Sequence, residues 1–533
     1  MKEGGGDQRA GARIGIAAGA AVVLGAAIRL ALGLRDLGVL DALFIPDDTY
    51  YTLAIARSLA AGLGPTADGI VLTNGFQPLL AFLLVPVFWL TQDPDAALRA
   101  AILIGAASDA ASVHLLYRIG ARTISPVAGV LAAAFWSVSP LALGNALNGL
   151  ETSLSLAAVL GALVAWDSVG RNARLQRFTL VGLVWGTALL ARVDTALIVV
   201  LFGLVLLFRR EWGPLFFSMI GALCVVLPWW LSSTVMFGSP VPESGAAVRE
   251  ITRLHRELYL GTPGQIAWAL GTVVQAPCSH SRAFREEVWA VQHSAGILAL
   301  IYCAAVVSAG FALSRLRPPD ARPPLLPVLA GWAMAVFAFY VWYVPAVWFY
   351  PRYLLPVAAV VTLFASGLLA VLFETLRDGR LRTAGAVVGM VLMIPGGTAA
   401  LGFLSAHPDG TVDTWLHGAK GYRRAALEVY RSVPPGSVVG SLQTGALEYY
   451  APPGVRVVNL DGVVDRHAAR AFRDGNLGEY ARSRGMTHLA DWPFNYENFV
   501  RRGGEAARRA RFTEVARAFP QGRDVLVLAS VEW

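Results

Sequence analysis

Long runs of apolar residues follow one another between residues 14 and 404, with short polar segments between them. A helix needs about 20 mostly apolar residues to cross a hydrocarbon core of roughly 30 Å. The runs predict eleven spanning helices, over residues 14–34, 98–117, 124–143, 150–168, 177–191, 193–208, 214–234, 294–314, 325–344, 353–374 and 383–404. A shorter run at 76–91, interrupted by Pro86, is predicted to be an interfacial or re-entrant helix.

The arginines between the runs decide whether 76–91 spans. They gather in short clusters: Arg118 and Arg122; Arg171, Arg174 and Arg177; Arg209 and Arg210; Arg315, Arg317 and Arg322; Arg377, Arg380 and Arg382. If 76–91 does not span, every cluster lies on the side of the basic N-terminal tail, which the positive-inside rule places in the cytoplasm. This topology puts the first outer loop, 35–75, another outer loop, 235–293, and everything after about 405 on the outer face.

Composition supports a multi-pass protein of the plasma membrane. The chain has 533 residues, of which 56% are hydrophobic and only 15% charged, too few charges for a soluble surface. The net charge of +8 comes from arginines placed where cytoplasmic loops need them, so membrane lipids are expected partners and nucleic acid is not. The three cysteines are too dispersed for a disulfide framework or a metal motif.

The composition changes after Ala400, where charges become frequent and short β-rich segments alternate with helical ones. Strands are predicted at 437–442, 455–460, 486–491 and 524–530, and helices at 413–432 and 465–484. The sequence therefore predicts two domains. Residues 1–404 form a transmembrane domain, and residues 405–533 form a soluble α/β domain on the outer face.

An acidic pair, Asp47 and Asp48, opens the helical segment TYYTLAIARSLAAG in the first outer loop. A helix N-terminus favours acidic residues, which accounts for one carboxylate better than for two. Adjacent carboxylates have pKa values pushed apart, so that one acts as a base while the other orients a hydroxyl or a metal. Both residues are predicted to be catalytic.

Further polar residues lie on the predicted outer face. Asn74 and Gln77, in TNGFQPL, are predicted to bind sugar hydroxyls or phosphate, because amide groups both donate and accept hydrogen bonds. Glu151, in NGLE, is predicted to bind sugar hydroxyls or a divalent ion. Arg192 and Asp194 fit a structural ion pair as well as they fit a site. Asp109, inside the second predicted span, fits a buried hydrogen-bonding role equally well.

Two arginines of the outer face are candidates for binding phosphate. Arg352 and Tyr353 lie in the aromatic segment WFYPRYLLP, and Arg249 lies in the outer loop 235–293. A guanidinium presents a planar fork of donors that suits phosphate. An aromatic belt with a snorkelling arginine is the structural alternative. All three residues are predicted to bind substrate.

The segments PDDTYYTLAIARSLAAG, TNGFQPL, NGLE and PRYLLP together resemble the GT-C superfamily of integral-membrane glycosyltransferases. The superfamily includes protein O-mannosyltransferases, lipid A aminoarabinose transferases and mycobacterial arabinofuranosyltransferases. The resemblance covers residues 14–404 and implies a polyprenyl-phosphate sugar as donor. It also implies a carboxylate base in the first outer loop, which corresponds to Asp47, with Asp48 in the second place. Some members use a divalent metal ion and others do not, so a metal stays open.

The prediction is therefore an inverting glycosyltransferase that moves a sugar to a hydroxyl of a glycan, lipid or protein acceptor. A transporter or flippase is a weaker alternative, because transporters usually show internal repeats and none is apparent. A non-catalytic scaffold for cell-envelope glycans is the other alternative.

Overall fold

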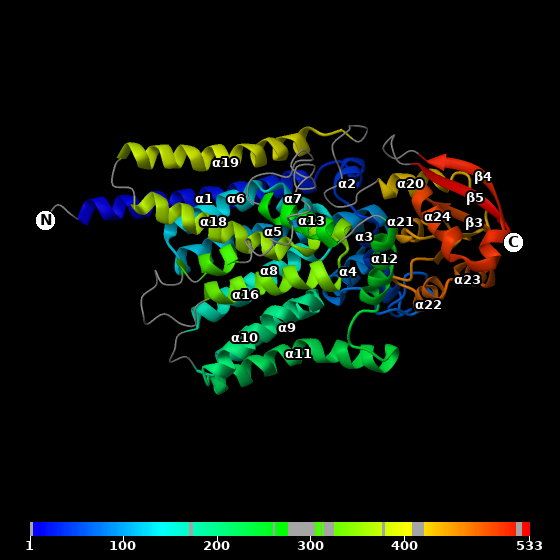
Figure 1. Cartoon of the computed structure of the whole chain (residues 1–533), viewed down its shortest axis with the longest axis horizontal. Coiled ribbons are helices and arrows are strands. Elements are labelled where there is room, and N and C mark those ends of the chain that lie inside the picture. Colours follow the sequence, from blue (N-terminus) through cyan, green and yellow to red (C-terminus); the bar gives the residue numbers. More distant parts are fainter. Residues whose placement is uncertain are drawn as a thin grey trace.

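The computed structural model describes residues 4–169, 174–258, 262–275, 304–310, 312–313, 325–375, 379–407, 421–518 and 525–533. A bundle of long helices forms one end of the molecule, and a domain built on a β-sheet forms the other (Figure 1). The chain begins at the end of the bundle remote from the sheet and finishes in the sheet domain (Figure 1). This is the arrangement that the predicted topology requires, while the direction of insertion stays a prediction.

The described helices of the bundle follow the apolar runs. They are α1 (Gly4–Gly33), α5 (Pro94–Thr123), α6 (Pro126–Val138), α7 (Pro140–Leu147), α8 (Thr152–Ser168), α9 (Gln176–Ala191), α10 (Ala196–Phe208), α11 (Trp212–Phe237), α13 (Thr262–Gln275), α16 (Leu325–Ala338), α18 (Leu355–Thr375) and α19 (Gly379–Ser405). Five described helices are long and apolar enough to cross a membrane, or six if the bent pair α6–α7 is one span. A multi-pass helical protein is thus confirmed, although eleven spans are not reached by this criterion. The predicted span 294–314 lies mostly outside the described residues.

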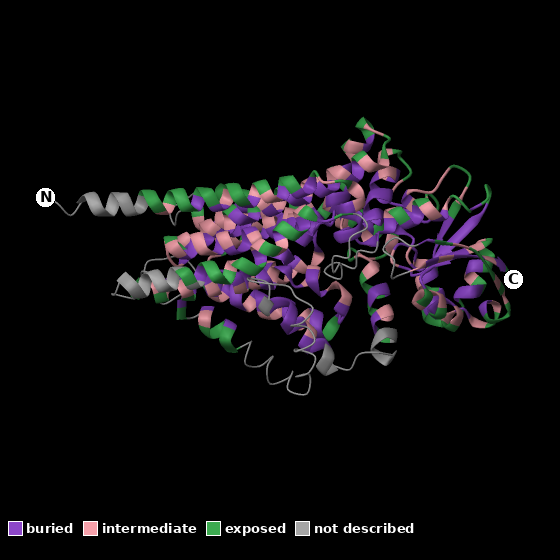
Figure 2. Ribbon diagram, turned by 90° about the horizontal axis from the view of Figure 1, so that it is seen from above, coloured by how far each residue is buried: buried purple, intermediate pink, exposed green. Residues whose placement is uncertain are grey.

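Exposed residues lie on the outside of the bundle and buried residues lie inside it (Figure 2). Val235 and Leu30 are among the large apolar side chains exposed on it, which suits contact with lipid tails rather than water. Inside the bundle, Arg29 and Asp109 form a buried ion pair with N···O 2.6 Å, and the Trp136 indole donates to Asp109 at 3.0 Å. Of the two readings left open for Asp109, the structure supports the buried hydrogen-bonding role.

Short helices join the bundle to the sheet domain (Figure 1). They are α2 (Leu37–Leu43), α3 (Asp47–Ala60), α4 (Pro78–Leu90) and α12 (Ser244–Leu258). Helix α4 falls within the predicted interfacial segment, and its 13 residues span only about 20 Å at 1.5 Å per residue. That length is short of a hydrocarbon core, but α10 has the same length, so the interfacial position of α4 stays a prediction.

The sheet domain contains one mixed five-stranded sheet with the order β2-β1-β3-β5-β4. Its strands are β1 (Val438–Ser441), β2 (Arg456–Asn459), β3 (His488–Asp491), β4 (Arg511–Ala518) and β5 (Leu526–Glu532). Its described helices are α20 (Tyr422–Val429), α21 (Gly445–Tyr449), α22 (Arg466–Asp474), α23 (Leu477–Ser483), α24 (Pro493–Arg502) and α25 (Gly504–Arg509). Strands β2, β1 and β3 are parallel, whereas β5 and β4 are antiparallel additions at one edge.

Four strands lie where the sequence predicted them, but β4 was not predicted. Its exposed positions carry the charges of Arg511, Glu514 and Arg517, which are poor strand formers. Pairing with β5, interrupted by a bulge between Glu514 and Ala516, holds it at the sheet edge. The predicted helix 465–484 is two helices, because Gly475 adopts φ 73° and ends α22.

Candidate active site

Adjacent carboxylates at the start of α3 point into different surroundings. Asp47 is only 5% exposed, and its two carboxylate oxygens accept the backbone N–H groups of Gly445 at 2.8 Å and Ala446 at 2.9 Å. Those N–H groups belong to the first turn of α21 in the sheet domain. Asp48 is half-buried and lines a cavity at the junction with the bundle. The pair is therefore divided between a domain contact and a cavity.

The surroundings of Asp47 are those of a structural contact. Burial raises the pKa of its carboxyl to about 8, and the charges of Asp48 and Asp461 add to the rise while the two N–H bonds oppose it. A Cβ at position 445 would lie 2.1 Å from the Asp47 carbonyl oxygen. Only glycine allows this approach of α21 to α3.

Tyr51, one turn further along α3, is held by the same domain. Its hydroxyl donates to Asp461 at 3.1 Å and accepts the backbone N–H of Thr444 at 3.0 Å. The loop before α4 is also in close contact, since a Cβ at Gly75 would lie 2.1 Å from the carbonyl oxygen of Val463. The first outer loop and the sheet domain therefore pack as one unit around the cavity.

The cavity measures about 110 Å³ and brings together chain segments that are far apart in sequence. Its polar lining includes Asp48, Gln77, Glu151, Arg352 and Tyr353, all of which the sequence singled out. The remaining lining residues are Tyr51, Thr52, Gly75, Phe76, Leu150, Arg192, Ser244, Val248, Phe349 and Val463. We call this space the catalytic cavity, after the role proposed for it below.

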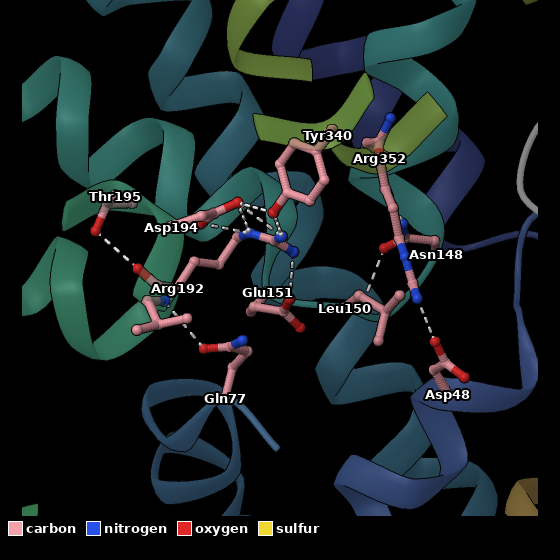
Figure 3. A network of polar contacts seen from close by, with 12 residues as sticks. Asp48, Gln77, Asn148, Leu150, Glu151, Arg192, Asp194, Thr195, Tyr340 and Arg352 are labelled. Carbon is pink, nitrogen blue, oxygen red and sulfur yellow. Dashed lines mark hydrogen bonds and ion pairs between the residues drawn. The ribbon is translucent and has the colours of Figure 1, made fainter. Parts of the chain in front are cut away.

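Arg352 is the cation that faces Asp48. It lies on α17 (Tyr350–Tyr353), a single turn between the 3-10 turn η4 (Val347–Phe349) and α18, and its Nη2 donates to the Asp48 carboxylate (Figure 3). The guanidinium lies over the Phe349 ring, 3.8 Å from its centroid. Among the described residues, nothing accepts a hydrogen bond from its buried Nε. A donor is thus left for a ligand in the cavity.

Arg192, in contrast, is held by a closed set of partners (Figure 3). Its Nη1 donates to Glu151 at 2.8 Å, and its Nη2 donates to Asp194 at 2.9 Å and to the Tyr340 hydroxyl at 3.0 Å. The Tyr340 hydroxyl in turn donates to Asp194. Two carboxylates surround the Arg192 guanidinium and already neutralise its charge. Arg192 is therefore poorly suited to bind a phosphate.

The same network fixes two predicted binding residues. Gln77 accepts the backbone N–H of Val193 at 3.3 Å, in the 3-10 turn η1 (Val193–Thr195) that carries Asp194. Tyr353 stacks on Tyr340 with ring centroids 4.3 Å apart. Tyr340 belongs to η3 (Phe339–Tyr343), a π-helical turn after α16. Gln77 and Tyr353 therefore have set orientations at the cavity wall.

Two predicted binding residues lie outside the catalytic cavity. Asn74 donates to the Ser233 hydroxyl at 2.9 Å and accepts the backbone N–H of Glu243 at 3.1 Å, so it ties the loop before α4 to the connection between α11 and α12. Arg249 lies over the Tyr343 ring, 4.3 Å from its centroid, and lines a second, larger cavity.

Tyr51 and Val463 line the cavity but were not predicted from the sequence. Tyr51 follows Asp48 by three residues, the spacing that puts two side chains on one helix face, so this signal was available. Val463 belongs to the sheet domain, and no local pattern indicates that its loop reaches the bundle.

The described residues do not fit a metal site. No group of three or more His, Cys, Asp or Glu side chains among them is placed to hold a metal ion, and calcium, magnesium or zinc needs several such ligands. Asp48 is paired with Arg352, and both oxygens of Asp47 accept backbone N–H groups. The chemistry below is derived without a metal.

A family described as dolichyl-phosphate-mannose-protein mannosyltransferase has a model that matches residues 77–236. Comparison with the curated proteins gives no match.

Two solved structures have a fold similar to that of this chain. ArnT from Cupriavidus metallidurans, bound to undecaprenyl phosphate, is 16% identical with a TM-score of 0.55, over 95% of this chain and 97% of that one. The oligosaccharyltransferase of Archaeoglobus fulgidus, in complex with Zn and sulfate, is 15% identical with a TM-score of 0.54, over 93% of this chain and 71% of that one. These likenesses confirm the GT-C fold that the sequence motifs predicted, with its multi-pass bundle and C-terminal sheet domain.

Proposed function

We propose that this protein is an inverting glycosyltransferase that moves a sugar from a polyprenyl-phosphate donor to a hydroxyl acceptor. The observation that carries the proposal is the meeting of Asp48 and Arg352 in one cavity at the end of the bundle. One is a half-buried carboxylate that a small hydroxyl can reach, and the other is a guanidinium with an unpartnered Nε.

The donor phosphate binds Arg352. A guanidinium engages phosphate through two parallel N–H bonds, and Nε with one Nη supplies that fork. The Nη2 that now donates to Asp48 is then shared with the phosphate, so donor binding weakens the Asp48–Arg352 ion pair. Asp48 is thereby released to accept a proton only when a donor is present.

The chemistry is a single displacement. Asp48 removes the proton of the acceptor hydroxyl, and the oxygen attacks the anomeric carbon from the face opposite the phosphate. The bond between the anomeric carbon and the phosphate oxygen breaks, and its electron pair goes to the phosphate. The products are a glycosylated acceptor of inverted configuration and polyprenyl phosphate. Arg352 stabilises the negative charge that develops on the leaving group.

The base is thus Asp48 in this proposal, whereas the sequence motif placed Asp47 first. Both oxygens of Asp47 are occupied by the N–H groups of α21, and Asp47 does not line the catalytic cavity. We assign Asp47 a positioning role, in which it holds the sheet domain against α3. The Glu151–Arg192–Asp194 network positions Gln77 and Tyr353 in the same way.

A lipid-borne donor agrees with the position of the cavity. Its lining includes residues of α3 and α12 and Val463 of the sheet domain, and α3 and α12 lie where the bundle meets the sheet domain (Figure 1). At this place a polyprenyl chain remains in the membrane while its phosphate reaches Arg352. ArnT, which shares the fold, was solved with undecaprenyl phosphate. The acceptor hydroxyl enters from the outer face, where the predicted topology places the sheet domain.

Purified protein in nanodiscs, incubated with a panel of undecaprenyl-phosphate hexoses and pentoses, tests the proposal. We expect one donor to be consumed and undecaprenyl phosphate to be released by the wild type but not by Asp48→Asn. If no donor is consumed, the scaffold alternative is favoured. If a labelled lipid instead crosses the bilayer unchanged, the protein is a flippase.

Orientation is tested separately by cysteine labelling in a variant that lacks the native cysteines. A cysteine at Gly62, exposed in the first outer loop, is expected to react with an impermeant reagent in intact cells. A cysteine at Leu175, exposed just before α9, is expected to react only after lysis. The reverse pattern would overturn the topology.

A further inference from the structure

A second cavity, of about 580 Å³, lies between α12, the end of η3 with the residues that follow it, and α22 of the sheet domain. Five arginines and two glutamates contribute to its wall. The full lining consists of Glu243, Ala246, Ala247, Arg249, Glu250, Thr252, Arg253, Trp342, Tyr343, Pro345, Arg466, Ala469, Arg470 and Arg473. We call it the basic cavity.

Helix α22 presents one basic face to this cavity. Arg466, Arg470 and Arg473 are spaced by four and three residues, which places them on one side of a helix. None of the three has an ion pair or hydrogen bond within the described part of the chain. The opposite side of α22 carries the buried Phe472. Like charges at this spacing repel one another, and a bound anion would relieve that repulsion.

The α12 side of the cavity adds charge that is only partly compensated. Arg253 donates to Glu250 at 2.8 Å. Arg249 instead uses an aromatic partner, because its Nη1 donates to the Tyr343 hydroxyl at 3.1 Å and its guanidinium lies over the same ring. Arginines exceed carboxylates by three in the lining, so the cavity attracts anions.

The basic cavity adjoins the catalytic cavity. Helix α12 supplies Ser244 and Val248 to one and Arg249 to the other. The loop before α22 gives Val463 to the catalytic cavity, three residues before Arg466. A molecule held in the basic cavity therefore needs only a short extension to bring a hydroxyl to Asp48.

We propose that the basic cavity binds the acceptor and that the acceptor carries phosphate groups. This inference rests on the proposed glycosyltransferase function. The donor's own phosphate is assigned to Arg352 in the other cavity, so the cations of α22 are not needed for it. Planar guanidinium groups suit phosphate better than neutral sugar hydroxyls. The phosphate belongs either to a soluble glycan or to a lipid head group.

Binding measurements on the full chain separate these sources. In neutral-lipid nanodiscs, titration calorimetry measures a phosphorylated oligosaccharide against its unphosphorylated form. In neutral detergent, native mass spectrometry measures phosphatidic acid against phosphatidylcholine. The test variant is Arg470→Glu/Arg473→Glu. The matched control is Arg508→Glu/Arg511→Glu, whose arginines are exposed and lie outside the cavity. The milder Arg470→Gln/Arg473→Gln provides a second test if the charge reversal unfolds the domain.

We expect the phosphorylated probe of at least one arm to bind, and the test variant to weaken it about tenfold or more, since hydrogen bonds between charged groups are lost. The control is expected to bind as the wild type does. Equal binding by test and control variants, or by phosphorylated and unphosphorylated probes, would overturn the proposal. Asp48→Asn is expected to keep probe binding. If the test variant loses probe binding but the wild type consumes no donor, the anion-binding site is supported and the proposed transferase function is rejected. If the test variant transfers sugar from the donor with an unchanged acceptor KM, the transferase function is supported and the basic cavity is rejected as the acceptor site.

Discussion

Replacing Asp48 by asparagine separates catalysis from folding at this site. Asparagine is close in size and keeps a carbonyl oxygen that accepts from Arg352, but it cannot take a proton. The Asp48 side chain is 28% exposed, that of Arg352 is 11% exposed, and Asp48 has no other ion pair among the described residues. The expected loss of folding free energy is about 1–2 kcal/mol, between the values for exposed and buried pairs. The fold should therefore survive the substitution.

The catalytic effect should be much larger. A positioned general base contributes roughly 10²–10⁴-fold to a rate, which corresponds to about 3–5 kcal/mol in the activation free energy. We expect kcat for consumption of the identified donor to fall by that factor, while the melting temperature changes little. Initial rates in nanodiscs and a thermal melt of the same sample measure both quantities.

Asp47→Asn is the matched control, because it makes the same chemical change one residue away. An amide nitrogen would replace one of the two oxygens that accept from Gly445 and Ala446, leaving a buried donor without an acceptor at a cost of about 1–3 kcal/mol. This variant should lose stability first and activity as a consequence. The reasoning is refuted if Asp47→Asn abolishes transfer at an unchanged melting temperature while Asp48→Asn remains active.

Three further outcomes are expected. Arg352→Lys should raise the donor KM about tenfold, since an ammonium lacks the guanidinium fork; an unchanged KM would remove Arg352 from the phosphate site. Gly445→Val should lower the melting temperature and activity together, because a Cβ at that position meets the Asp47 carbonyl oxygen; a variant of wild-type stability would contradict the close packing. Burial raises the pKa values of Asp47 and Glu448 to about 8. Because a raised folded-state pKa gives stability that is complete below the unfolded value near 4 and lost as pH rises to about 8, the melting temperature should fall from pH 5 to pH 8, and less steeply in Asp47→Asn. A rise over that interval would contradict the assignment.

Local patterns predicted much of the fold. The length of the apolar runs indicated the bundle helices, and short β-rich segments bounded by turn residues indicated β1, β2, β3 and β5. Both signals depend only on residues that are neighbours in the sequence. The edge strand β4 was missed because its charged residues are poor strand formers and its conformation depends on pairing with β5. The number of spans stayed a prediction, since several bundle helices are shorter or bent.

Sequence motifs and side-chain chemistry alone pointed to the acidic pair, to Gln77 and Glu151, and to Arg352. Gln77, Glu151 and Arg352 line one cavity. Of the acidic pair, Asp48 lines that cavity and Asp47 does not. The roles within that set needed long-range contacts. Arg192 has too many carboxylate partners to serve as a phosphate clamp, and Asn74 is occupied by the α11–α12 connection. Neither fact is visible in the residues next to them.

The sequence by itself determined that this chain is a membrane protein with an acidic pair at the start of a helix before α4. Only the tertiary structure decided what each carboxylate does. Successive residues of a helix point about 100° apart, so Asp47 meets Gly445 from the sheet domain while Asp48 meets Arg352 from the bundle. Those partners lie 398 and 304 residues away along the chain, at a distance where no local pattern carries information.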